Sequence, residues 1–219
     1  MADRIRVIIA DDHKLVRQGT RELLNRQPDI DVVGEAADGE EAVVLVDALL
    51  PDVALLDVVM PRVDGLEACR RIKQQHPDVA VLALTIHDDD EYVLALLEAG
   101  ASGYMLKDAD TEELADAIRA VRGGKGVLHP GVVRTVLDHV QPEPGTAAPD
   151  PPLSDREFEV LKLAAEGLSN KEIAERLGLS VWTVQTHLGH VFEKLGTRSR
   201  TQAVVRGLRA GWLRLDQLD

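Results

Sequence analysis

Five side chains able to bind a cation or to handle a phosphoryl group stand at the ends of short apolar runs in this chain. Asp11 and Asp12 follow the first run, Asp57 and Thr85 end two others, and Lys107 follows a fourth. If these runs are parallel strands of one sheet, their carboxyl ends share one edge and the five side chains converge there. Taken singly, Asp11 and Asp12 could be a helix cap and Lys107 a solvated lysine. Their common position at strand ends favours a single site.

The charges of such a site indicate its chemistry. Three crowded carboxylates repel one another unless a cation lies among them, and hard oxygen ligands suit Mg²⁺. With the metal bound, ionised Asp57 could attack a phosphoryl group as a nucleophile, because Mg²⁺ offsets the repulsion between the two anions. Lys107 would add a positive charge beside the phosphoryl oxygens, and Thr85 would add a hydroxyl hydrogen bond.

The elements that must position these residues alternate from residue 4 to about residue 122. Nearly continuous runs of Val, Ile, Leu and Ala predict strands buried on both faces, and segments with helical spacing of apolar residues lie between them. Five strands alternating with five helices predict an α/β fold with a doubly wound parallel sheet. The predicted strands are residues 4–10, 31–36, 52–57, 79–85 and 103–106.

Four motifs at these positions resemble the receiver domain of two-component response regulators. Residues 7–13 look like the family's first strand and acidic pair. Residues 57–65 match its phosphoacceptor loop, which has Asp, two variable residues, Met-Pro and, after two more residues, Asp-Gly. Residues 82–85 and 103–107 match its fourth and fifth strands. The resemblance implies a flavodoxin-like receiver with a five-stranded sheet, which we assign to residues 1–124.

The resemblance also implies a role for each residue of the site. Asp57 would accept a phosphoryl group from a sensor histidine kinase, and Lys107 would contact the phosphoryl oxygens. Thr85 and Tyr104 resemble the switch pair, in which the hydroxyl moves to the phosphoryl group and the aromatic ring turns inward. The Mg²⁺ ligands that the resemblance implies are Asp11, Asp12, Asp57 and the backbone carbonyl of Val59.

Two residues depart from the common receiver pattern. Ile86 stands where a small residue is usual, which leaves Tyr104 less room to turn inward. Asp108 stands where many receivers carry proline, so a cis peptide bond is not implied there.

One enzymatic alternative also uses an aspartyl nucleophile. Phosphohydrolases of the haloacid-dehalogenase type carry an acid/base aspartate two residues after the nucleophile. This chain has Val59 there, which cannot transfer protons. The sequence therefore predicts a signalling site and not an enzyme.

The pattern changes after residue 124. Apolar residues after Pro130 predict one more helix, and five prolines with a glycine in residues 141–152 predict a linker. Only helical patterns follow, and serines stand as N-caps before three of these helices. We assign residues 125–152 to the extra helix and linker, and residues 153–219 to a small all-α domain of four helices.

The second and third of these helices, at 170–177 and 180–195, are joined by a turn at Gly178, as in a helix-turn-helix. Residues 168–174, together with Thr183, Val184, His187, Lys194 and Leu195, closely resemble the LuxR-type helix-turn-helix. With the receiver motifs, they place the chain by resemblance in the NarL/FixJ subfamily of response regulators.

Under this resemblance, residues 180–195 are the recognition helix that enters the major groove of double-stranded DNA. Its candidates for base contacts are Thr183, Gln185, Thr186, Gly189 and His190. The candidates for phosphate contacts are Lys171, Lys194, Arg198 and Arg200, each with a solvated helix surface as the alternative. Gln185 replaces the lysine most often found in the family, which weakens non-specific attraction and could favour adenine.

Charge and composition are compatible with this assignment. Residues 153–219 hold 10 Lys and Arg against 9 Asp and Glu, a net charge of +1, so the other residues carry −14 of the total of −13. A near-neutral domain can bind DNA if its cations share one face. We see no signal peptide and no apolar stretch of the roughly 18 residues that a membrane span needs. The single cysteine cannot form an internal disulfide, and we expect a cytoplasmic protein without a membrane partner.

The expected mechanism joins the two domains. The unphosphorylated receiver would restrain the DNA-binding helices, and phosphorylation of Asp57 would shift the population toward a dimer. Residues 201–210 resemble the family's dimer surface, and RNA polymerase is a further partner that the family suggests. One alternative is a phosphorylation-independent DNA-binding regulator with a receiver used for dimerisation. A pure protein-interaction module is another, which the complete helix-turn-helix disfavours.

Overall fold

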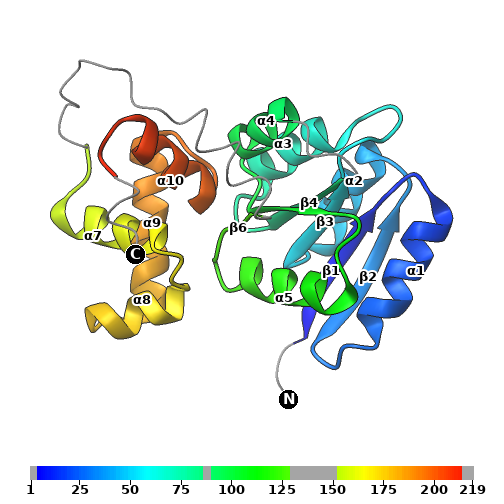
Figure 1. Ribbon diagram of the computed structural model, residues 1–219, viewed down its shortest axis with the longest axis horizontal. Helices are drawn as coiled ribbons and strands as arrows, with labels where there is room; N and C mark the ends of the chain where they lie inside the picture. The colour runs from blue at the N-terminus through cyan, green and yellow to red at the C-terminus, as the bar shows by residue number, and fades with distance from the viewer. Residues whose placement is uncertain (1–3, 86–89, 129–151, 214–219) are drawn as a thin grey trace.

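The computed structural model describes residues 4–85, 90–128 and 152–213 (Figure 1). The predicted helix after Pro130, most of the predicted linker and Ile86 lie outside these residues. Among the helices that are described, none is long and apolar enough to cross a membrane.

The N-terminal part is the predicted doubly wound sheet. Its strands run parallel in the order β2-β1-β3-β4-β5-β6, so the order reverses beside β1. Every residue of β3 and β4 is buried, as their uninterrupted apolar character predicts. The first five strands agree with the predicted ones to within one residue at each end. They are β1 (Ile5–Ala10), β2 (Ile30–Ala36), β3 (Val53–Asp57), β4 (Ala80–Thr85) and β5 (Gly103–Leu106).

A sixth strand was not predicted. The two-residue strand β6 (Val127–Leu128) pairs in parallel with β5 and extends the sheet. It begins the segment assigned to the extra helix and linker, so the edge of the sheet reaches past residue 124. Two residues carry too little pattern to be recognised as a strand from sequence.

Helices cover both faces of the sheet (Figure 1). One apolar cluster joins the sheet to α1 and α5, and a second joins it to α2, α3 and α4. Aspartates cap α2, α3 and α5 at their N-termini, where each side chain accepts a hydrogen bond from a backbone N–H. The helices are α1 (Lys14–Asn25), α2 (Gly39–Leu49), α3 (Gly65–Gln75), α4 (Asp90–Ala99) and α5 (Thr111–Arg122).

The C-terminal part is helical, as predicted. Ser154, Ser169 and Ser180 are the N-caps expected from the sequence, and Gly178 ends its helix in the left-handed conformation that glycine adopts readily. A fourth serine, Ser199, caps the last helix. The four helices are α7 (Asp155–Ala165), α8 (Asn170–Leu177), α9 (Val181–Leu195) and α10 (Arg200–Arg209).

The two parts meet mainly through α10. The Ser199 hydroxyl donates to the backbone oxygen of Ala101 at 3.1 Å, and the Thr201 hydroxyl donates to that of Ser102 at 3.0 Å. The Gln202 amide donates to the backbone oxygen of Glu98 at 2.8 Å. The apolar cluster on the α2–α4 face of the sheet also continues into the helical part. The receiver therefore holds α10 by both apolar and polar contacts.

Candidate functional site

The carboxyl ends of the strands bring the predicted acidic residues together. Asp11 and Asp57 are buried, Asp12 is partly exposed, and Thr85 is 4% exposed beside them on the sheet. One oxygen or nitrogen atom from each of Asp11, Asp12, His13 and Asp57 lies within 4.8 Å of the others. The fold thus places the three predicted carboxylates in one pocket.

Lys107 joins the two buried carboxylates of this pocket. Its Nζ donates at 2.7 Å to Asp11 Oδ2 and at 2.7 Å to Asp57 Oδ2. Burial by itself would lower the pKa of Lys107, but its bonds to Asp11 and Asp57 raise that pKa above its ordinary value. Burial also raises the pKa of Asp57, although Lys107 acts in the opposite direction. The ammonium group offsets part of the charge that the crowded carboxylates carry.

Backbone contacts fix the geometry of the pocket. The Val59 N–H donates to Asp57 Oδ1 at 3.3 Å, and the His13 N–H donates to Asp11 Oδ1 at 2.8 Å. The backbone N–H of Lys107 donates to the backbone oxygen of Thr85 at 2.7 Å, and this bond ties the ends of β4 and β5 together. The first two bonds orient the buried carboxylates, and the third fixes the end of the strand that precedes Lys107.

The pocket fits a hard divalent cation. Its nearest donors are carboxylate oxygens, the ligands that Mg²⁺ prefers, and partly exposed Asp12 leaves room for water on one side. Sequence reasoning missed His13, whose Nδ1 lies 2.7 Å from Asp12 Oδ1. His13 is largely exposed and its nitrogen is a poor ligand for Mg²⁺, so we regard it as a partner of Asp12.

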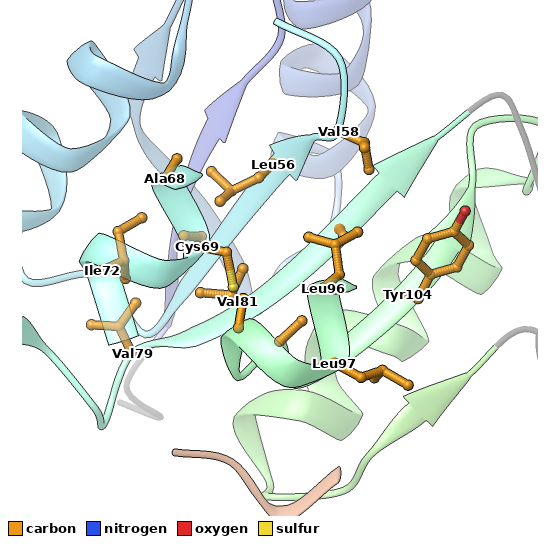
Figure 2. Packing of buried hydrophobic residues seen from close by; sticks show 14 of the residues in the cluster. Leu56, Val58, Ala68, Cys69, Ile72, Val79, Val81, Leu96, Leu97 and Tyr104 are labelled. Carbon is orange, nitrogen blue, oxygen red and sulfur yellow. The ribbon is translucent and has the colours of Figure 1, made fainter. Parts of the chain in front are cut away.

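Tyr104 already lies inside the protein. Its side chain is 1% exposed and belongs to the apolar cluster that includes Leu96 and Leu97 of α4 (Figure 2). Ile86 lies outside the described residues, so the expectation that it leaves Tyr104 less room to turn inward stays a prediction.

The helix-turn-helix has the predicted geometry. Val184, Leu188, Val191 and Leu195 of α9 are buried, and α9 packs against α7 and α8. The five candidates for base contacts all lie outside this buried stripe. Gln185, Gly189 and His190 are exposed, and Thr183 and Thr186 are partly exposed. The surface expected to enter the DNA groove is therefore open to solvent.

The four cations predicted to contact phosphate differ in their environments. Lys171 is exposed at the start of α8. Lys194 pairs with Glu157 at 2.6 Å, and Arg198 is partly buried, with its Cβ close to Gly100 of the receiver. Arg200 requires a correction, because it is 8% exposed and turned into the protein.

The contacts of Arg200 explain its burial. Its guanidinium donates to the backbone oxygens of Gly124 at 2.9 Å and Ala164 at 2.6 Å. Burial lowers the pKa of Arg200 to about 10. In this conformation Arg200 joins the two parts of the chain and does not offer a phosphate contact. The local pattern missed this because Gly124 is distant in sequence.

Sequence reasoning also missed Trp182 of α9. This side chain is 74% exposed, and the neighbouring Val181 is 41% exposed. Counting 100° per residue from Val184 and Leu188 would have placed Trp182 on the outer face of the helix.

Comparisons with known proteins agree with this geometry. The sequence-family model of the response regulator receiver domain matches residues 7–119. The sequence-family model of the bacterial regulatory proteins of the luxR family matches residues 151–206. The chain belongs to the NarL/FixJ family of two-component response regulators, which are transcription regulators with a receiver and a LuxR-type DNA-binding domain.

Two curated relatives match over nearly their whole length. The transcriptional regulatory protein LiaR of Bacillus subtilis (strain 168) is 44% identical over 201 residues, which cover 92% of this chain and 95% of LiaR. The oxygen regulatory protein NreC of Staphylococcus carnosus (strain TM300) is 40% identical over 211 residues, or 94% of this chain and 97% of NreC.

Two solved structures match over nearly the whole chain. The response regulator ChrA of a heme-sensing two-component system has a TM-score of 0.53 and 38% identity, covering 96% of this chain and 99% of ChrA. A complex of the response regulator RcsB with DNA has a TM-score of 0.56 and 29% identity, covering 93% of this chain and 98% of the RcsB chain.

Proposed function

We propose that Asp57 accepts a phosphoryl group from a sensor histidine kinase and that this modification controls dimerisation and sequence-specific DNA binding. The observation that carries the proposal is the bridge of Lys107 between Asp11 and Asp57 at the carboxyl ends of the strands. The proposal keeps the domain limits assigned from the sequence, residues 1–124 and 153–219. It places the protein in the cytoplasm, where its DNA is.

The residues of the pocket would divide the transfer among them. A carboxylate oxygen of Asp57 attacks phosphorus, the bond from phosphorus to the kinase histidine breaks, and the histidine leaves as neutral imidazole after gaining a proton. Lys107 would move from Asp57 to the phosphoryl oxygens, and the Thr85 hydroxyl would donate to one of them. Asp11, Asp12, Asp57 and the Val59 carbonyl would hold Mg²⁺, which neutralises charge on the phosphoryl group when bound.

The signal has a short route from this pocket to α10. Thr85 and Tyr104 lie on β4 and β5, and the Lys107 N–H ties the ends of these strands together. At the opposite end of β5, Ala101 and Ser102 accept the hydrogen bonds of α10. A shift of β5 that follows a change at Thr85 or Tyr104 would disturb these bonds and favour release of α10.

The structure supports a specific form of restraint. The outer face of α9 is exposed in the described residues, so the receiver does not restrain DNA binding by covering that face. The receiver contacts the side of α10 that carries Thr201, Gln202 and Arg209, and Val205 lines a cavity there with residues of α4. Release of α10 would make this surface available for a dimer, and a dimer would bind two half-sites. RNA polymerase remains a further partner that we propose from the family.

The test is to incubate the protein with Mg²⁺ and a small phosphodonor and to follow intact mass, elution volume and DNA binding. We expect a phosphate adduct, a dimer and tighter DNA binding in the wild type, and none of these in Asp57→Asn. Asp116→Asn is a matched control, because this aspartate is 77% exposed on α5. An adduct without a change in assembly or DNA binding would refute control by phosphorylation. A dimer that binds DNA equally well without an adduct would favour the phosphorylation-independent regulator.

A further inference from the structure

The first half of the face of α9 opposite its buried stripe is formed by one large side chain and two small residues, and exposed Glu193 lies on the same side further along the helix. Successive residues of a helix are 100° apart, so Trp182, Thr186 and Gly189 lie on the side opposite Val184 and Leu188. Trp182 is 74% exposed. A Cβ built on Gly189 would meet no atom within 4 Å. The indole ring is therefore the most prominent feature of the surface that faces DNA.

We propose that Trp182 recognises thymine by packing its ring against the 5-methyl group in the major groove. This inference rests on DNA binding through α9 and adds a specificity determinant to it. Apolar side chains distinguish thymine from the other bases through that methyl group. The occupant of this face is thus a double-stranded DNA half-site that contains thymine at one position.

The position of Trp182 in the helix supports this role. The first turn of a recognition helix contacts base edges, and Trp182 is the second residue of α9. The partly exposed side chain of Val181 extends the apolar surface beside the ring. A ring placed further along the helix would be less suited to contact base edges.

Apart from the indole N–H of Trp182 itself, this face has little capacity to donate hydrogen bonds. The Thr186 hydroxyl donates to the backbone oxygen of Trp182 at 3.0 Å, so its only proton is already engaged. Neither Gly189 nor any other position of the stripe formed by residues 182, 186 and 189 carries a cation that could bind guanine. Gln185, at the flank, is the nearest exposed amide. The centre of the face therefore offers the apolar ring of Trp182 and one donor, its indole N–H.

The test removes single methyl groups from the DNA. A half-site is first selected from random DNA with the wild-type protein, and each thymine is then replaced by uracil, which lacks only the methyl group. Fluorescence anisotropy gives the affinity of each duplex for the wild type, Trp182→Ala and Trp182→Phe. Val181→Ala is the control for loss of a neighbouring exposed apolar side chain.

We expect one thymine at which uracil weakens wild-type binding about fourfold, the effect of one buried methyl group. Trp182→Ala should lose this sensitivity, and Trp182→Phe and Val181→Ala should keep it. The salt dependence of Trp182→Ala should match that of the wild type, because phosphate contacts are unchanged.

Three results would overturn the inference. One is a wild type that is insensitive to uracil at every position. Another is a Trp182→Ala variant that keeps the full sensitivity. The third is a Trp182→Ala variant that loses affinity equally for all sequences, which would assign the ring to the DNA backbone. If the wild type bound no DNA at all, the proposed function would fail before this test began.

Discussion

Thr201 offers the sharpest test of the contact between α10 and the receiver. Its hydroxyl donates to the Ser102 oxygen at 3.0 Å, and the two residues belong to different parts of the chain. Thr201→Val keeps the shape of the side chain and removes only this bond. Thr201 is not the N-cap of α10, so the helix keeps its cap at Ser199.

The size of the effect follows from the contacts that remain. The Ser102 oxygen still accepts from the Val127 N–H at 3.3 Å, so the substitution does not leave it without a partner. Loss of one neutral hydrogen bond costs about 1 kcal/mol. That change raises the ratio of protein with α10 released to protein with α10 held roughly fivefold. The apparent DNA affinity rises with the fraction of protein in which α10 is released. We expect up to fivefold tighter DNA binding by the unphosphorylated variant.

Thr197→Val is the matched control. Thr197 lies just before α10, and its Oγ1 is buried without a hydrogen-bond partner among the described residues. Replacing a buried hydroxyl that has no hydrogen-bond partner by a methyl group should leave the contact between α10 and the receiver intact or strengthen it. DNA binding is measured by fluorescence anisotropy and assembly by sedimentation, before and after phosphorylation. The two substitutions make the same chemical change, so only the interdomain bond distinguishes them.

The phosphorylated proteins provide the second half of the test. Release of α10 would be nearly complete after phosphorylation. Phosphorylated Thr201→Val should therefore bind DNA as tightly as the phosphorylated wild type. Equal DNA affinity of the unphosphorylated wild type and Thr201→Val would refute the proposed restraint. An equal gain in Thr197→Val and Thr201→Val would also refute it, because the Thr201 hydroxyl donates to the receiver and Thr197 Oγ1 has no hydrogen-bond partner among the described residues.

Two further predictions concern other contacts of the helical part. A Cβ on Gly126 would lie 2.8 Å from Thr201 Oγ1, so Gly126→Ala should push α10 away from the receiver. The dimer fraction measured by sedimentation should then increase, and an unchanged dimer fraction would contradict this prediction. The bonds from Lys194 and Ser154 lower the pKa of Glu157 to about 2, below its ordinary value of 4.5. The stabilisation by this carboxylate is complete above pH 4.5 and is lost as the pH falls toward 2. The difference in thermal stability between wild type and Glu157→Gln should therefore shrink over that range, and a constant difference would argue against the ion pair.

The acidic pocket was predictable because its residues are tied to local patterns. Apolar runs defined the strands to within one residue, and each functional residue stands at a strand end. The geometry of a parallel sheet then brings Asp11, Asp57 and Lys107 together without knowledge of any loop. The serine caps were equally accessible, since a cap depends on only a few neighbouring residues.

The contacts between domains were not predictable in this way. Arg200 read as a surface cation because its acceptors at Gly124 and Ala164 are far away in sequence. The two-residue strand β6 exists because β5 offers it a free edge, and its own residues hold too little pattern to define it. Only packing between distant elements decided these features.

The sequence alone determined the class of fold, the composition of the phosphoryl pocket and the helix-turn-helix, because each depends on short-range periodicity and on residue types at element ends. Tertiary structure decided that Tyr104 and Arg200 are buried and that the receiver holds α10 and leaves α9 open. The physical reason is that burial is a property of pairs of surfaces. An amphipathic helix shows which face it will bury, and only the assembled chain decides which surface covers that face.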